Sequence, residues 1–79
     1  MTVKESVNQI AGKILHRTDL DLSGGVTFKQ IGADSLDVVQ IIVAIEDKYD
    51  IELLDDELQA LKNVGDFIAL VERKVAAKG

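Results

Sequence analysis

The 79-residue chain contains no cysteine. This excludes a disulfide framework, a thiolate metal site and a thiol nucleophile that the chain itself supplies. Its longest unbroken apolar run covers residues 41–45, which is far too short to span a membrane. The first ten residues, MTVKESVNQI, hold no apolar signal core, so we expect no secretion. A reducing cytoplasm is therefore the expected compartment.

Basic residues are scarce in the second half of the chain. Residues 1–34 carry four bases and four acids, whereas residues 35–79 carry five bases and ten acids and so hold the whole net charge of −5. Between residues 34 and 57 there are nine acids, and Lys48 is the only base. This balance argues against a nucleic-acid binder, which needs bases to neutralise phosphates. The acidic segment is either an ordinary solvated surface or a docking surface for basic partners.

Hydrophobic spacing predicts helices and no strands, because apolar and polar residues never alternate over a sustained stretch. We expect the first helix over residues 3–16, with Thr2 and Glu5 as its capping box. The second helix is expected over residues 35–49, with Asp34 as its N-cap.

A short third helix is expected over residues 55–61. A fourth should begin after Asn63, paired with Asp66 as a cap, and the tail AAKG at residues 76–79 should fray. The connection over residues 17–34 is unusually long for a compact domain, but it contains apolar residues that should fix it onto the helices. These are Leu20, Leu22, Val26, Phe28 and Ile31. The sequence thus predicts a single all-α domain over residues 1–79, a small four-helix bundle with three main helices, one short helix and a long first loop.

The second helix carries two apolar stripes when its residues are placed about 100° apart on a helical wheel. The first stripe should face the core. It contains Val38, Ile41, Ile42, Ile45 and Tyr49. The second, here called the outer stripe, contains Leu36, Val39 and Val43 and is flanked by Glu46, Asp47 and Gln40. Either the third helix or the loop covers the outer stripe, or it is an exposed contact patch with a charged rim.

Ser35 lies at the start of this helix, between Asp34 and Leu36. A catalytic serine needs a base within reach, but the only histidine, His16, is expected on the surface at the end of the first helix. No G-x-S-x-G elbow surrounds Ser35 either. Ser35 is then an ordinary first-turn residue or an attachment point, because free N–H groups and the positive end of the helix dipole suit a phosphoester there.

The segment Gly32-Ala33-Asp34-Ser35-Leu36-Asp37 resembles the G-A-D-S-L-D motif of acyl carrier proteins. The similarity continues through VVQIIVAIEDKYDIEL and the acidic segment that follows, and the order of helices matches over nearly the whole chain. The resemblance implies a carrier and not an enzyme. A phosphopantetheinyl transferase would attach 4′-phosphopantetheine to Ser35, with Asp34 helping the transferase to engage its metal ion. The thiol of the arm would hold acyl groups as thioesters, which explains how a chain without cysteine performs thiol chemistry.

The same resemblance implies a carrier of fatty-acid synthesis, which we expect to be monomeric and cytoplasmic. Its partners would be synthases, transferases and reductases that dock through basic patches. Four carboxylates would meet these patches, and the outer stripe would meet apolar spots beside them. The carboxylates are those of Asp37, Glu46, Asp47 and Asp56. The core would open to receive a short acyl chain.

Two departures from the family pattern leave a specialised carrier open, for polyketide or other acyl transfer. Gln40 and Lys48 stand where fatty-acid carriers commonly have glutamates. Leu53-Leu54-Asp55 replaces a common I-P-D, which affects where the third helix starts. Peptidyl and D-alanyl carriers use the same serine and arm, but their motifs differ before the serine.

Two interpretations of other classes remain. A calcium protein is suggested by an EF-hand-like spacing of Asp19, Asp21, Ser23, Gly24 and Thr27. Gln30, however, occupies the position that needs a bidentate carboxylate, so weak divalent binding near residues 50–57 is the more plausible form of this idea. The other is an unmodified acidic interaction module, whose function would not depend on Ser35.

Overall fold

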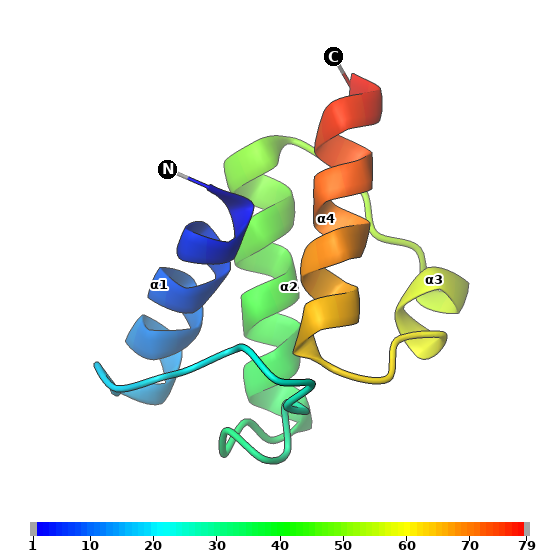
Figure 1. The fold of residues 1–79 in the computed structure, drawn as a ribbon. Coiled ribbons are helices and arrows are strands. Elements are labelled where there is room, and N and C mark those ends of the chain that lie inside the picture. The colour runs from blue at the N-terminus through cyan, green and yellow to red at the C-terminus, as the bar shows by residue number, and fades with distance from the viewer. Residues whose placement is uncertain (1, 79) are drawn as a thin grey trace.

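The computed structural model describes residues 2–78, which form four helices joined by loops (Figure 1). The helices are α1 (Val3–Leu15), α2 (Ser35–Tyr49), α3 (Asp55–Gln59) and α4 (Val64–Lys78). No strand occurs in the described part of the chain, which confirms the predicted bundle of three main helices and one short helix. None of these helices is both long and apolar enough to cross a membrane.

The three main helices stand side by side, and α3 lies apart from α1, beyond α4 in this view (Figure 1). The start of α1 and the ends of α2 and α4 share one end of the bundle. The long first loop and the start of α2 lie at the opposite end, here called the loop end. Ser35, as the first residue of α2, is therefore held at the loop end.

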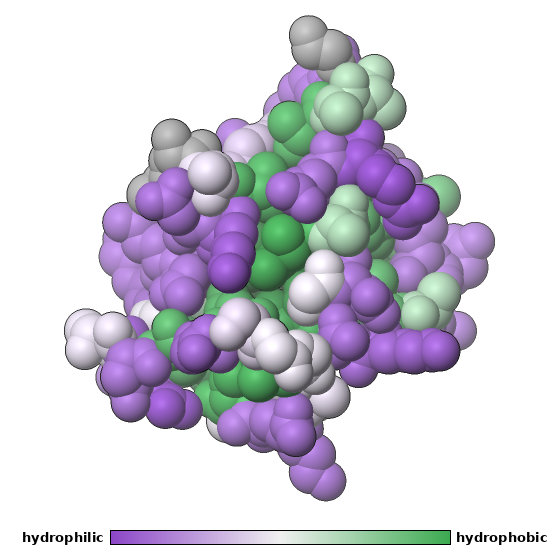
Figure 2. Space-filling view, viewed as in Figure 1, coloured by the Kyte–Doolittle hydropathy of each residue, from purple (hydrophilic) through white to green (hydrophobic). Residues whose placement is uncertain are grey.

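The main helices bury their apolar faces against one another. Val7 and Ala11 from α1, Ile41 and Ile45 from α2 and Phe67 from α4 are essentially inaccessible to solvent. On the face shown in Figure 2, hydrophobic side chains gather between α1 and α4, and hydrophilic side chains cover the outer sides. Burial of such side chains is the main source of stability in a domain this small.

One buried polar pair joins α1 to α2. Ser6 is fully buried, and its Oγ accepts a hydrogen bond of 2.8 Å from the Tyr49 hydroxyl. Because an unpaired buried hydroxyl is costly, this bond fixes how the end of α2 lies against the start of α1.

The long loop is fixed to the helices, as predicted from its apolar residues. Leu22 and Ile31 are buried, and the Phe28 ring contacts the Phe67 ring edge-on at 5.6 Å between centroids. The Val64 amide at the start of α4 donates to the Val26 carbonyl at 2.8 Å. The loop therefore closes the bundle at the end where α2 begins.

Two predicted helix ends need correction. The first helix stops at Leu15, one residue early, because His16 adopts a left-handed conformation with φ of 57°. The third stops at Gln59 and not at residue 61, because the chain turns there to bring Leu61 against the core.

The predicted fraying of the tail is wrong for residues 76–78, which continue α4; Gly79 lies outside the described residues. The Lys78 ammonium bonds the Tyr49 and Asp50 carbonyls at 3.2 and 3.0 Å and the Asp50 carboxylate at 2.8 Å. Lys78 thereby binds the carbonyls at the end of α2, which favours a cation, and this contact holds the end of α4 in place.

Candidate functional site

Ser35 is exposed at the first position of α2. Within residues 2–78 its hydroxyl makes no hydrogen bond, and the amides of the first helical turn before Asp37 have no acceptor inside the helix. The hydroxyl is thus free to react, beside N–H groups and the positive end of a helix dipole that favour an anion. These features fit a phosphoester at Ser35.

The other two serines of the chain are engaged elsewhere. Ser6 is buried at the α1–α2 contact. The Ser23 hydroxyl donates a 2.6 Å hydrogen bond to Asp21 Oδ1. Ser35 is therefore the one serine that combines exposure, a free hydroxyl and a helix N-terminus.

Asp34 and Asp37 form a reciprocal cap around Ser35. The Asp37 amide donates to Asp34 Oδ1 at 2.9 Å, and the Asp34 amide donates to Asp37 Oδ2 at 3.2 Å. The predicted N-cap role of Asp34 is confirmed, and Asp37 completes a capping box. Each carboxylate keeps a second oxygen that can meet another ligand.

The outer stripe is exposed, as one of the two interpretations from sequence expected. Leu36, Val39 and Val43 have exposed fractions of 65%, 53% and 56%. Neither α3 nor the loop covers them. A fourth large apolar side chain, Leu54, is 45% exposed at the N-cap of α3 and was missed from sequence. The sequence feature that points to Leu54 is the Leu53-Leu54-Asp55 segment, where the family commonly has I-P-D. That replacement adds an apolar side chain to the surface, as well as affecting where α3 starts.

The predicted rim carboxylates differ in their exposure to solvent and in their hydrogen bonds. Asp47 and Asp56 are exposed. Glu46 is half-buried, and its Oε2 accepts the Leu53 amide at 2.9 Å. This bond links α2 to the segment that leads into α3.

The short helix α3 buries no residue completely, although Leu58 packs against the core, and polar contacts also fix its position. The Lys74 ammonium of α4 pairs with Glu57 Oε1 at 2.8 Å, and that oxygen also accepts the Leu54 amide at 3.1 Å. These two hydrogen bonds, that of Lys74 first, hold the pKa of Glu57 below its usual value. Lys74 thus ties the acidic start of α3 to α4.

The carboxylates that suggested a calcium loop make contacts within the loop. Asp19 is paired with Arg17 at 3.1 Å, and Asp21 Oδ1 accepts both the Ser23 amide and the Ser23 hydroxyl. The Arg17 guanidinium lowers the pKa of Asp19, and the Ser23 hydroxyl lowers that of Asp21. No cluster of three metal-ligating side chains occurs within residues 2–78.

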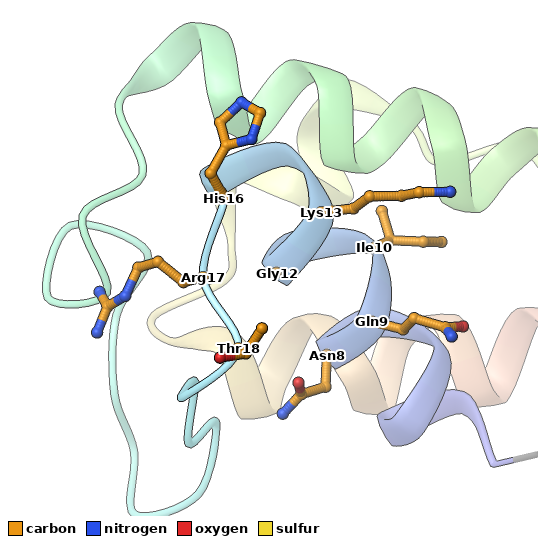
Figure 3. A pocket seen from close by; sticks show the side chains of 8 residues that line it. All are labelled: Asn8, Gln9, Ile10, Gly12, Lys13, His16, Arg17 and Thr18. Carbon is orange, nitrogen blue, oxygen red and sulfur yellow. The ribbon is translucent and has the colours of Figure 1, made fainter.

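An open hollow of about 530 Å³ lies along α1 and the first residues of the long loop (Figure 3). Lys13, His16 and Arg17 on its border point in different directions, so they do not converge on one ligand. The lining residues are Asn8, Gln9, Ile10, Gly12, Lys13, His16, Arg17 and Thr18. Ser35 is not among them.

Comparison with known proteins shows that Ser35 lies within a stretch of the chain that matches a known family. Residues 5–71 match the family described as "Phosphopantetheine attachment site". The chain is 40% identical to the acyl carrier protein of Streptococcus thermophilus over 74 residues, which cover 94% of this chain and 97% of that protein. It is 50% identical to the acyl carrier protein of a Sulfurovum species over 44 residues, and this match spans 56% of this chain and 59% of that protein.

The fold also matches a solved structure closely. The solution NMR structure of holo acyl carrier protein from Geobacter metallireducens has a TM-score of 0.87 and 34% sequence identity, over 99% of this chain and 91% of that one. The similarity therefore extends over all four helices and the long loop.

Proposed function

The chain belongs to the phosphopantetheine-attachment family, among the acyl carrier proteins, and from this we propose that Ser35 bears its 4′-phosphopantetheine. As a member of this family, the protein is a carrier of acyl groups and not an enzyme, and the group is attached covalently. The observation that supports Ser35 is the comparison of the three serines, of which Ser35 alone is exposed with a free hydroxyl.

The attachment is a phosphoryl transfer from coenzyme A. Ser35 Oγ forms a bond to the phosphorus that carries the pantetheine, and the pyrophosphate P–O bond breaks. Adenosine 3′,5′-bisphosphate leaves with the electron pair. The hydroxyl proton passes to a base of the transferase or to water. The attached group supplies a terminal thiol that holds acyl groups as thioesters.

The surface around Ser35 supports docking to enzymes with basic patches. The outer stripe and Leu54 supply apolar contact area, and Asp37, Asp47 and Asp56 supply the charged rim. Such a rim accelerates encounter with a basic partner, while the apolar centre contributes to affinity. The proposed partners are a phosphopantetheinyl transferase and the synthases, transferases and reductases of fatty-acid synthesis, in the cytoplasm.

Intact-mass spectrometry tests the attachment site. The folded chain is incubated with coenzyme A, Mg²⁺ and a promiscuous phosphopantetheinyl transferase, beside the variants Ser35→Ala and Ser23→Ala. We expect one added phosphopantetheine on the native chain and on Ser23→Ala, and none on Ser35→Ala. Addition to Ser35→Ala, or none to a folded native chain, would contradict the proposal.

A further inference from the structure

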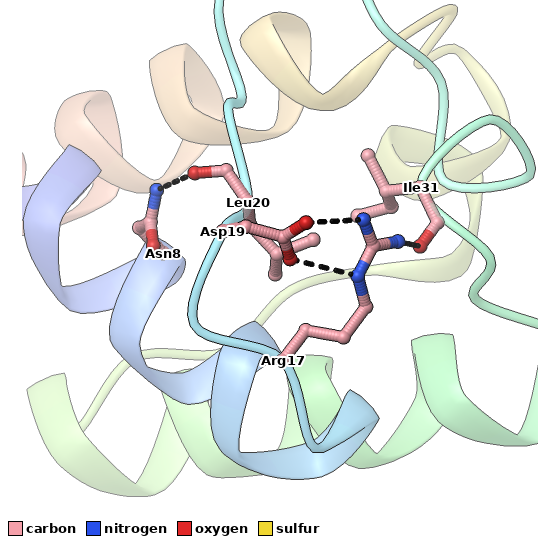
Figure 4. Close-up of polar contacts among 5 residues, drawn as sticks. All are labelled: Asn8, Arg17, Asp19, Leu20 and Ile31. Carbon is pink, nitrogen blue, oxygen red and sulfur yellow. Dashed lines mark hydrogen bonds and ion pairs between the residues drawn. The ribbon is translucent and has the colours of Figure 1, made fainter.

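Arg17 joins the two ends of the long loop through a single side chain (Figure 4). Its Nε and Nη2 donate to the two carboxylate oxygens of Asp19 at 3.1 and 3.3 Å. Its Nη1 donates to the main-chain carbonyl of Ile31 at 3.1 Å. The Asp19 carboxylate therefore orients the guanidinium, and the guanidinium in turn holds the chain shortly before α2.

The carbonyl that Arg17 holds precedes the turn into the attachment site. Gly32 follows it in a left-handed conformation, with φ of 87°, and a Cβ at Gly32 would lie 3.9 Å from Arg17 Nη1. The Ala33 amide bonds back to the Phe28 carbonyl at 2.9 Å. Asp34 then caps α2, so the path of the chain at Ile31 and Gly32 determines where Ser35 begins the helix.

The other polar groups of this turn are held by local main-chain bonds. The amides of Ile31 and Gly32 donate to the Thr27 and Lys29 carbonyls at 3.3 and 3.0 Å. Within residues 2–78, the Ile31 carbonyl accepts only from Arg17. Loss of Arg17 would leave this carbonyl to water and remove the side-chain bond that orients the turn, while the buried Ile31 side chain would still anchor it.

We propose that Arg17 is a positioning residue for the modification of Ser35. It holds the Ile31–Gly32 turn so that the Ser35 hydroxyl is presented to the transferase in a fixed orientation. Arg17 does not itself contact the reacting atoms. The inference rests on the assignment of Ser35 as the attachment site.

Asn8, on α1, offers a control contact to the same loop. Its side-chain amide donates to the Leu20 carbonyl at 3.1 Å, the same length as the Arg17–Ile31 bond, but far from Ser35 in sequence (Figure 4). Asn8→Ala removes one hydrogen bond between α1 and the loop, whereas Arg17→Met removes the bond to the Ile31 carbonyl and the two bonds to Asp19. Arg17→Lys keeps the charge but places its donors on a single nitrogen, which can bond either Asp19 or the Ile31 carbonyl.

The experiment measures kcat and KM for the carrier in transferase-catalysed loading, with melting temperature for each variant. We expect Arg17→Met to lower kcat about tenfold, because a misplacement of about 1 Å can cost about 100-fold and the main-chain bonds of the turn limit the shift. KM should stay within about twofold, because the docking surface on α2 is unchanged. Arg17→Lys should fall between the native chain and Arg17→Met, and Asn8→Ala should load as the native chain does.

Three results would overturn the proposal. They are loading of Arg17→Met at the native rate, a rise in KM at unchanged kcat, and equal loss of kcat in Asn8→Ala. The second would show a direct surface contact with the transferase, and the third a general loosening of the loop. If Arg17→Met does not fold, Arg17→Lys and Asn8→Ala decide between the same outcomes. A native chain that never loads would contradict Ser35 as the attachment site, which is a separate failure.

Discussion

Asp34 caps α2, and we propose a second task for it in recognition by the transferase. One oxygen, Oδ1, accepts the Asp37 amide and so caps α2. The charge of the group, next to Ser35, is what a metal-dependent transferase would use. The structural task needs only an acceptor oxygen, whereas the recognition task needs the negative charge.

Two substitutions at this position distinguish these tasks. We expect Asp34→Ala to lower the free energy of unfolding by about 1 kcal/mol, the usual cost of losing an N-cap, and to lower loading as well. Asp34→Asn keeps an acceptor for the Asp37 amide and should retain stability, but it should lose most of the loading rate. Urea unfolding and the intact-mass assay check the two effects. Full loading of Asp34→Asn would limit Asp34 to its structural task.

At the level of residues, contacts between near neighbours in the sequence could be predicted, whereas contacts between distant residues could not. The Thr2–Glu5 box and the Asp34 cap follow from neighbours three residues apart, and both occur as predicted. Arg17 and Ile31 are fourteen residues apart and meet only because the loop folds back. No spacing rule connects them, so the sequence did not indicate a role for Arg17.

The helix α2 presents one apolar stripe to the core and another to solvent. The wheel predicted both, because helical periodicity fixes which side chains share a face whatever they pack against. It could not decide whether α3 covers the outer stripe, since that depends on where the Glu46–Leu53 bond places α3. The end of α3 and the order of the tail depended in the same way on contacts with other elements, such as Lys78 with Asp50.

Substitutions on the exposed side chains test the docking surface. We expect Val39→Ser and Leu54→Ser to raise the KM of the transferase for the carrier about fivefold, as loss of a moderate interface contact does. Stability should change by less than about 0.5 kcal/mol for Val39→Ser, because this position is exposed. Leu54→Ser should not destabilise the fold, because serine is favoured at the N-cap of α3. Ala69→Ser, exposed on α4, serves as the control and should leave KM unchanged. An unchanged KM for Leu54→Ser alone would restrict the contact to α2.

Across the whole molecule, negative charge gathers in the segment that contains α2 and α3. Two bases of α4 offset part of it, since Lys74 pairs with Glu57 and Lys78 with Asp50, each at 2.8 Å. The Lys78 ammonium also lowers the pKa of Asp50. The remaining carboxylates repel one another in the folded state more than in an expanded chain.

Screening this repulsion should stabilise the fold. We expect the melting temperature to rise with NaCl up to about 1 M, where the Debye length is near 3 Å. Mg²⁺ at millimolar concentration should raise it further than NaCl of equal ionic strength if divalent ions bind near residues 50–57. Differential scanning calorimetry at matched ionic strength separates screening from binding. A melting temperature indifferent to both salts would show that repulsion does not limit stability.

Tyr49, which donates a hydrogen bond to Ser6, can serve as a built-in fluorescent probe of the protein. The chain has one tyrosine and no tryptophan, so its intrinsic emission comes from Tyr49 with no indole to quench it by energy transfer. The phenol reports on the contact between α1 and α2, at the end of the bundle opposite Ser35. A change in Tyr49 emission when an acyl group is loaded would therefore show that loading alters the α1–α2 contact at the end of α2 opposite Ser35. The measurement needs no added label.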